Sequence, residues 1–148
     1  MTSPEAAVPP VPGSNASGPA APGPRRSLGL ILFAHGARDP RWAEPFEAIV
    51  AAVRSRAPDI AVELAFLELM RPSLEEAAAA LAGQGVESID VLPLFLGTGG
   101  HLRRDLPPLV DGIAARFPAI RFTLHGAAGE APALIAALAE HALSLTRT

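Results

Sequence analysis

The chain has 148 residues, of which 49% are hydrophobic, and its formal net charge is −3. This length suits one domain, and the weak negative charge, without a basic run, argues against nucleic acid as the main partner. The absence of cysteine excludes disulfides, iron–sulfur clusters and cysteine zinc sites, so a metal would have to be bound by His, Asp or Glu.

Residues 1–26 differ in composition from the rest, because they contain 7 of the 16 prolines and are otherwise rich in Ala, Gly and Ser. Such a segment has too few large apolar groups to offset its ordering entropy. We therefore expect a disordered tail over 1–26 and a folded domain over 27–148. The start lacks the basic and apolar blocks of a signal peptide, and no apolar run approaches the roughly 20 residues of a membrane helix. The expected location is the cytoplasm, without membrane contact.

The folded part alternates between short apolar runs and longer amphipathic segments. Apolar runs bounded by polar or turn residues predict strands at 27–34, 60–67, 88–96 and 120–125. Helical spacing of apolar residues predicts helices at 41–57, 73–85, 103–117 and 130–145.

Proline and capping residues refine these elements. Ser73 and Glu76 have the spacing of a capping box at the start of the second helix. Pro107 and Pro108 are expected in the first turn of the third helix. Pro93 is unexpected within the third strand, because proline cannot donate to a strand ladder. In the last helix, Leu134, Ile135, Leu138, Ala142 and Leu145 form one apolar stripe.

Four strand–helix units in series predict an α/β fold, in which a four-stranded parallel sheet has helices on both faces. This is a single Rossmann-like or flavodoxin-like lobe. A helix of about 15 residues and a strand of about 7 residues both span about 22–23 Å. Each helix is therefore long enough to return the chain to the starting edge by a right-handed crossover.

Two histidines follow apolar strands in the same way, His35 in "LILFAHGARDPR" and His101 in "PLFLGTGGHLRRD". Glu68 follows the second strand. Ligands of such sheets bind outside the carboxyl ends of the strands, so we expect these three side chains at one edge. Two imidazoles and a carboxylate suit a borderline divalent metal such as cobalt, iron, nickel or zinc. His125 ends the fourth strand at the same edge, where an ordinary loop residue is the favoured interpretation and a rim residue is the alternative.

The glycines of "LGTGGH" either adopt positive φ or let the backbone approach a large flat ligand. Gly99 and Gly100 are the candidates nearest His101. A dinucleotide site is the competing interpretation, but Leu102 stands where its fingerprint requires glycine.

Arginines cluster near these strand ends: Arg38, Arg41, Arg71, Arg103 and Arg104. Every one of the 12 basic residues of the chain is arginine, and the planar guanidinium group suits carboxylates. A substrate with several carboxylates would fit this rim, with Arg38, Arg103 and Arg104 as the expected contacts.

The motifs "LILFAHGARDP", "VELAFLELMRPSLEEAAAAL" and "IDVLPLFLGTGGHLRRDLP" resemble those of the small, single-domain sirohydrochlorin cobaltochelatases. The resemblance extends over about residues 28–143. It departs from the family at Ala37, where serine is usual after the glycine, and in the long Pro/Ala-rich tail.

This resemblance implies a class II chelatase fold, a homodimer, and ATP-independent insertion of cobalt(II) into sirohydrochlorin during cobalamin biosynthesis. His35 and His101 match the family's paired metal-binding histidines, and Glu68 falls where a third ligand or a proton acceptor would lie. No cofactor beyond the substrate metal is implied. Iron(II) for siroheme, nickel(II), a metal carrier without catalysis, and a nucleotide-binding module are the alternatives.

Overall fold

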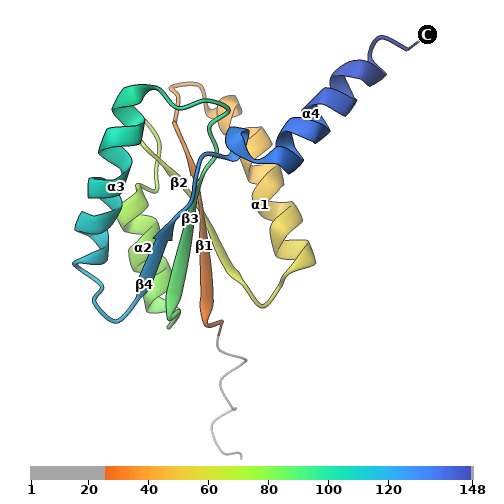
Figure 1. The fold of residues 1–148 in the computed structure, drawn as a ribbon. Helices are drawn as coiled ribbons and strands as arrows, with labels where there is room; N and C mark the ends of the chain where they lie inside the picture. Colours follow the sequence, from red (N-terminus) through yellow and green to blue (C-terminus); the bar gives the residue numbers. More distant parts are fainter. Residues whose placement is uncertain (1–25, 148) are drawn as a thin grey trace, which may run out of the picture.

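A computed structural model describes residues 26–147. Apart from Arg26, the tail expected over 1–26 lies outside this described part. The four strands are β1 (Leu28–Ala34), β2 (Ala61–Phe66), β3 (Ser88–Pro93) and β4 (Arg121–Leu124). They form one sheet in the order β2-β1-β3-β4 (Figure 1), and all three neighbouring pairs are parallel. The predicted parallel sheet is confirmed, with β1 between β2 and β3.

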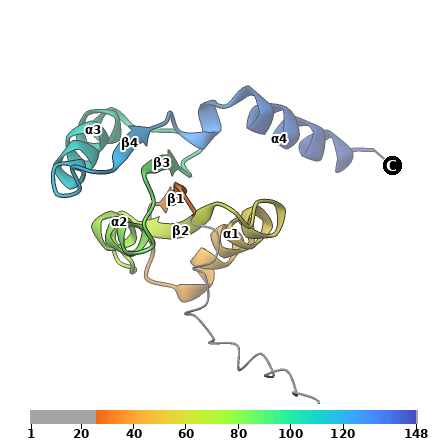
Figure 2. The same ribbon diagram turned by 90° about the horizontal axis from the view of Figure 1, so that it is seen from below.

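The helical elements are η1 (Pro40–Ala43), α1 (Glu44–Arg56), α2 (Leu74–Gly83), α3 (Gly100–Ala114), η2 (Ala128–Glu130) and α4 (Pro132–Ser144). In Figure 2, α2 and α3 cover one face of the sheet and α1 covers the other. None of the helices in the described range has the length and apolarity that crossing a bilayer requires.

The core follows the alternation of side chains along β1. Ile31 and Phe33 are fully buried on the face that packs against α2 and α3, whereas Leu32 packs on the opposite face with Val50 of α1. Each face of the sheet therefore has its own apolar layer, which is why β1 reads as a continuous apolar run.

The start of α2 confirms the predicted capping box. The Ser73 hydroxyl accepts a hydrogen bond from the Glu76 backbone N–H at 3.2 Å, and Glu76 Oε1 accepts one from the Ser73 backbone N–H at 3.3 Å. Two backbone donors that the helix itself leaves unsatisfied are paired in this way.

Pro93 is the fully buried last residue of β3. The Leu94 N–H donates to Phe33 of β1, and the Val91 carbonyl accepts from His125 beyond β4. Backbone groups alternate along a strand, so residue 93 faces the side of β4. Since β4 ends at Leu124, no strand on that side requires an N–H from Pro93.

The third helix begins three residues earlier than expected, at Gly100, and the expectation that Pro107 and Pro108 lie in its first turn is wrong. Both prolines lie inside α3, on its exposed side. Their missing N–H groups leave the carbonyls of residues 103 and 104 without helical donors. Solvent on that side can supply donors to these carbonyls instead.

The last helix does not use its apolar stripe within the chain. α4 extends away from the sheet (Figure 1), and none of its described residues is buried. Its main contact is with the short η2 turn.

Candidate functional site

The loops that follow β1 and β2 are joined beyond the ends of the strands. The Leu67 N–H donates to the Ala34 carbonyl at 2.9 Å, and the Glu68 N–H donates to the His35 carbonyl at 3.1 Å. The two loops therefore stay joined by backbone hydrogen bonds as far as the two candidate residues. His35 and Glu68, which are 33 positions apart in sequence, are placed side by side as predicted.

Gly36 allows this close approach. Its φ is +99°, and a Cβ atom built on it would lie 1.9 Å from the Glu68 carbonyl oxygen. No L side chain fits at that distance, and the left-handed backbone region is unfavourable for residues other than glycine. The need for glycine directly after His35 is thus steric.

The side chains of the two residues also meet. His35 Nε2 lies 3.1 Å from Glu68 Oε1, and the side chains are 47% and 55% exposed. The His35 ring stands edge-on to Phe95, with 6.1 Å between the ring centroids. Phe95, which follows β3, restricts one side of the imidazole, while the His35–Glu68 pair stays open to an ion from solvent.

The separation of these two atoms suits two ligands of one metal. Two atoms that bind the same divalent ion at about 2.1 Å lie about 3.0–3.4 Å apart, depending on the coordination geometry. The observed 3.1 Å lies in that range. The same contact would also let a neutral imidazole and a carboxylate share a proton.

His101 does not join this pair in the structure. It lies in the first turn of α3 with an exposed side chain. Between residues 26 and 147, no group of three or more His, Asp or Glu side chains is arranged to hold a metal ion. The three-residue ligand set therefore stays a prediction.

The glycines before His101 have ordinary negative or extended φ, so the expectation of positive φ is wrong for Gly97, Gly99 and Gly100. Gly99 is the N-cap of α3, and Gly100 is its first residue. A Cβ at Gly97 or Gly99 would meet no atom within 4 Å. These positions leave open space, which agrees with the other expectation, the approach of a large ligand.

The expected arginine rim divides into paired and unpaired residues. Arg41 forms an ion pair with Asp39 at 2.8 Å, and Arg71 forms one with Glu76 at 2.6 Å. Hydrogen bonds from Arg41 lower the pKa of the Asp39 carboxyl. Those from Arg71 are the main cause of a lowered pKa at Glu76.

The three arginines expected to bind substrate also differ from one another. Arg103 donates to Thr98 Oγ1 at 3.0 Å and to Glu130 at 2.7 Å. Within the described range of the chain, Arg38 and Arg104 form no ion pair. The last two are thus free to bind carboxylates.

Sequence reasoning missed the contribution of the segment after β4. The Gly129 N–H donates to the Phe95 carbonyl at 2.8 Å, and a Cβ on Gly129 would lie 1.7 Å from the Leu96 carbonyl oxygen. Together with the Arg103–Glu130 pair, this contact connects η2 to the loop between β3 and α3. The "GAAGE" motif after a strand end was the available signal.

His125 has a partner that the sequence did not predict, because its Nε2 lies 2.6 Å from Asp90 Oδ1 of β3. Both side chains are about half exposed. Among the described residues this pair and the His35–Glu68 pair are the two His–carboxylate contacts of the fold.

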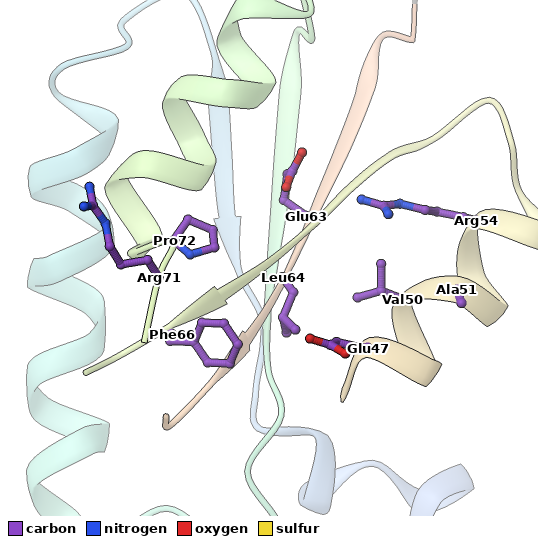
Figure 3. Close-up of a pocket in the computed structure, with 9 residues that line it drawn as sticks. All are labelled: Glu47, Val50, Ala51, Arg54, Glu63, Leu64, Phe66, Arg71 and Pro72. Atoms are coloured by element: carbon purple, nitrogen blue, oxygen red, sulfur yellow. The ribbon is translucent and has the colours of Figure 1, made fainter. Parts of the chain in front are cut away.

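A separate hollow of about 290 Å³ lies between α1 and the outer edge of β2 (Figure 3). Four charged residues line it: Glu47, Arg54, Glu63 and Arg71. Arg54 donates to the Val62 carbonyl at 2.7 Å, and Arg71 binds Glu76. Its arginines are thus used within the fold, and the hollow does not include His35, Glu68 or His101.

Comparison with known proteins places the chain in a family. The CbiX family model matches residues 29–145. The chain belongs to the CbiX family. The family membership that the sequence motifs predicted is confirmed.

Curated relatives agree with the assignment. A sirohydrochlorin cobaltochelatase of Methanosarcina acetivorans is 35% identical over 84 residues, which are 57% of this chain and 65% of that protein. Another, of Methanothermobacter thermautotrophicus, is 39% identical over 83 residues, which are 56% of this chain and 57% of that protein. The chain thus spans less than two thirds of these two relatives.

Solved structures share the fold. A CbiX protein of cobalamin biosynthesis from Marinobacter aquaeolei VT8 has a TM-score of 0.71 and 34% identity, covering 82% of this chain and 99% of that one. The sirohydrochlorin chelatase SirB from Bacillus subtilis subspecies spizizenii, in complex with cobalt, has a TM-score of 0.62 and 28% identity. That likeness covers 68% of this chain and 43% of SirB.

Proposed function

We propose that this CbiX-family chain is a cytoplasmic, homodimeric sirohydrochlorin cobaltochelatase, which inserts cobalt(II) into the tetrapyrrole without ATP. The observation that carries the proposal is the His35–Glu68 pair, whose 3.1 Å separation fits two ligands of one divalent ion at an open strand edge. The names of the matching relatives support the substrate and the metal.

Metal insertion requires that the tetrapyrrole lose two pyrrole protons as one divalent ion enters. In the proposed mechanism His35 binds the incoming ion, together with His101 from the start of α3. Glu68, whose carboxylate contacts His35 Nε2, either completes the ligand set or accepts one of the two pyrrole protons. Each proton that Glu68 does not accept passes to solvent water at this exposed edge. Open space at Gly97 and Gly99 gives the macrocycle room beside the metal.

Arg38 and Arg104 bind the substrate carboxylates in this mechanism, because they form no ion pair within residues 26–147. Arg103 takes part if it exchanges its partner Glu130 for a substrate carboxylate. Binding energy at these remote carboxylates can help distort the macrocycle toward the geometry of the transition state.

Iron is the second candidate metal. SirB from Bacillus subtilis, solved with Fe3+, is 27% identical with a TM-score of 0.61, covering 68% of this chain and 40% of that one. A ligand set of His and carboxylate does not discriminate between cobalt and iron, because the order of metal affinities at such sites is set mainly by the metal ion. Nickel(II) remains a third option on the same chemistry.

The test is an anaerobic absorbance assay with sirohydrochlorin and cobalt(II), compared with the spontaneous rate. We expect fast insertion by the wild type and loss of the enzymatic rate in His35→Ala and His101→Ala. The same assay with iron(II) and nickel(II) ranks the metals. Metal binding without acceleration by any of them would instead identify a metal carrier.

A further inference from the structure

Two leucines at the carboxyl edge of the sheet are open to solvent. Leu69, in the loop after β2, is 61% exposed, and Leu96, in the loop after β3, is 71% exposed. Apart from α4 and Leu145 at its C-terminal end, these are the two most exposed large apolar residues of the described chain. A single exposed leucine is common in a folded protein, but these two lie at one site.

The strand order places the two leucines on opposite sides of His35, because β1 lies between β2 and β3. Leu69 directly follows Glu68, whose carboxylate lies 3.1 Å from His35 Nε2. Leu96 directly follows Phe95, whose ring stands edge-on to the His35 imidazole. Neighbouring strands are only about 4.8 Å apart, so a large flat ligand over His35 would also cover both loops.

The backbone of Leu69 is strained. Its φ is +63°, and it is the one residue other than glycine with a positive φ between residues 26 and 147. The Met70 N–H donates to the Glu68 carbonyl at 2.8 Å, so Leu69 is the middle residue of a γ-turn. With a positive φ this turn is rare and unfavourable for a side chain. Such strained residues cluster at ligand-binding sites.

Packing within the chain does not explain the leucine at position 69. Glycine would adopt the same turn without strain, and the exposed leucine contributes little buried area in return. The fold therefore keeps an apolar side chain in a conformation that suits glycine, and leaves this side chain in solvent beside Glu68. A contact with a bound ligand would account for both features.

Leu96 is fixed through its backbone in a similar way. The Gly129 N–H donates to the Phe95 carbonyl at 2.8 Å, and a Cβ on Gly129 would lie 1.7 Å from the Leu96 carbonyl oxygen. The η2 turn thus packs directly on the main chain of Leu96, while its side chain stays exposed. A Cβ on the next residue, Gly97, would meet no atom within 4 Å, so space is open beside this leucine.

The surroundings define the chemistry of a suitable ligand. Ligand sites combine apolar contact area with a few polar groups that fix orientation. Here the apolar area comes from Leu69 and Leu96, and the polar groups are Arg38 and Arg104, which form no ion pair within the described residues. A wide, flat molecule with apolar faces and carboxylates at its periphery matches this arrangement.

We propose that Leu69 and Leu96 are substrate-binding residues, which pack against the macrocycle of the tetrapyrrole on either side of His35 and hold it over the His35–Glu68 pair. The inference rests on the proposed function and deepens it, because it names the side chains that bind the ring itself. Neither leucine supplies a metal ligand, so their contribution is to substrate binding and not to metal binding.

The test is a titration of the full-length protein with sirohydrochlorin in the absence of metal, followed by absorbance. Leu69→Ala and Leu96→Ala should each raise the dissociation constant about tenfold, because each removes apolar area that the ring would cover. Leu109→Ala is the matched control, since Leu109 is 40% exposed but lies well along α3 from the site. It should leave the constant unchanged.

A second variant separates binding from folding. Leu69→Gly removes the same side chain and relieves the positive φ, so its thermal unfolding temperature should equal or exceed that of the wild type. Its dissociation constant for sirohydrochlorin should nevertheless rise as in Leu69→Ala. Cobalt(II) binding without tetrapyrrole should stay at the wild-type level in all three leucine variants.

Two results would overturn the proposal. One is wild-type affinity for sirohydrochlorin in Leu69→Ala and Leu96→Ala. The other is a loss of cobalt(II) affinity as large as the loss of sirohydrochlorin affinity, which would assign the effect to a disturbed metal pair. Insertion is measured separately on the same preparations. Leucine-dependent binding without insertion would refute the chelatase alone, and insertion by both alanine variants with the wild-type KM would refute the role of the leucines alone.

Discussion

Gly36 lies so close to the Glu68 carbonyl oxygen that a side chain at position 36 would overlap it, with only 1.9 Å from a Cβ to that oxygen. The contact explains why the loops after β1 and β2 can carry His35 and Glu68 into hydrogen-bonding distance. Two separate features, a positive φ and a backbone–backbone approach, exclude other residues at this position.

Gly36→Ala is therefore expected to lower the free energy of unfolding by about 2 kcal/mol or more, and to weaken metal binding as the loops separate. Chemical denaturation and metal titration of the same sample measure both effects. Gly83→Ala is the matched control, because a Cβ there meets no atom within 4 Å in α2. It should leave stability unchanged or raise it by up to about 1 kcal/mol. Equal behaviour of the two variants would contradict the steric argument.

Removing either member of the His35–Glu68 pair should weaken cobalt(II) binding about tenfold or more, since even changes around metal ligands typically cost about 10–100-fold. His35→Ala and Glu68→Gln are compared with the wild type by calorimetric titration without tetrapyrrole. Glu63→Gln makes the same charge change on β2, and Glu63 borders the hollow between α1 and β2. If Glu63→Gln weakens cobalt(II) binding as much as Glu68→Gln, the weaker binding results from the loss of one negative charge and not from the loss of a metal ligand.

Arg38→Ala and Arg104→Ala should raise KM for sirohydrochlorin about tenfold with little change in kcat, if these side chains bind carboxylates equally in the ground and transition states. Steady-state kinetics at saturating metal measure this. A fall in kcat at unchanged KM for either variant would contradict a role in substrate binding.

Arg103 has a structural partner, so its substitution separates two roles. If Arg103 only holds η2, Arg103→Ala and Glu130→Ala should lower the free energy of unfolding by similar amounts. In a double-mutant cycle their coupling energy should be about 0.2–1 kcal/mol, as for other exposed ion pairs. Both side chains are about half exposed or more. A rise in KM in Arg103→Ala but not in Glu130→Ala would instead indicate carboxylate binding by Arg103.

The Arg71–Glu76 pair predicts an acid dependence of stability. Hydrogen bonds from Arg71 lower the folded-state pKa of Glu76 below its ordinary value of 4.5. Glu76 therefore stabilises the fold above about that pH, and this contribution is lost as the pH falls through the lowered folded-state pKa. Glu76→Gln keeps the capping-box geometry, because glutamine also serves at that position.

Urea denaturation from pH 7 to pH 3 should thus show a difference between wild type and Glu76→Gln that shrinks toward the acid end. The ion pair is exposed, so the difference at pH 7 should be small. A difference that grows on acidification would contradict the assigned cause.

Short-range patterns were enough to predict the four strands, although β3 ends at Pro93 and not at residue 96 as expected. They also predicted the sheet edge where His35 and Glu68 lie. His35 and Glu68 could be placed together because parallel strands end at a common edge. The start of α3 could not be predicted, because Pro107 and Pro108 are strong local signals for a first turn. In the structure the Arg103 N–H donates to the Gly99 carbonyl at 3.2 Å, so the helix begins at Gly100, before the prolines.

The ion pairs of the arginines could also not be predicted from the sequence. Arg103 and Arg104 are adjacent, yet Arg103 binds Glu130, 27 positions later, and Arg104 binds no acidic side chain among residues 26–147. Such a choice depends on where η2 packs. In the same way, the apolar spacing in α4 correctly predicted a helix, but this spacing does not reveal which surface the helix packs against.

The strand order β2-β1-β3-β4 has a consequence for synthesis on the ribosome. β1 is the first strand of the domain to be made, yet its second neighbour, β3, is completed only at Pro93. Until then one hydrogen-bonding edge of β1 is open, and Phe33 and Ile31 lack part of the layer that buries them. Long-range parallel pairing of this kind slows folding and prolongs exposure to aggregation. This edge of β1 and these side chains therefore stay exposed on the nascent chain until β3 has left the ribosome.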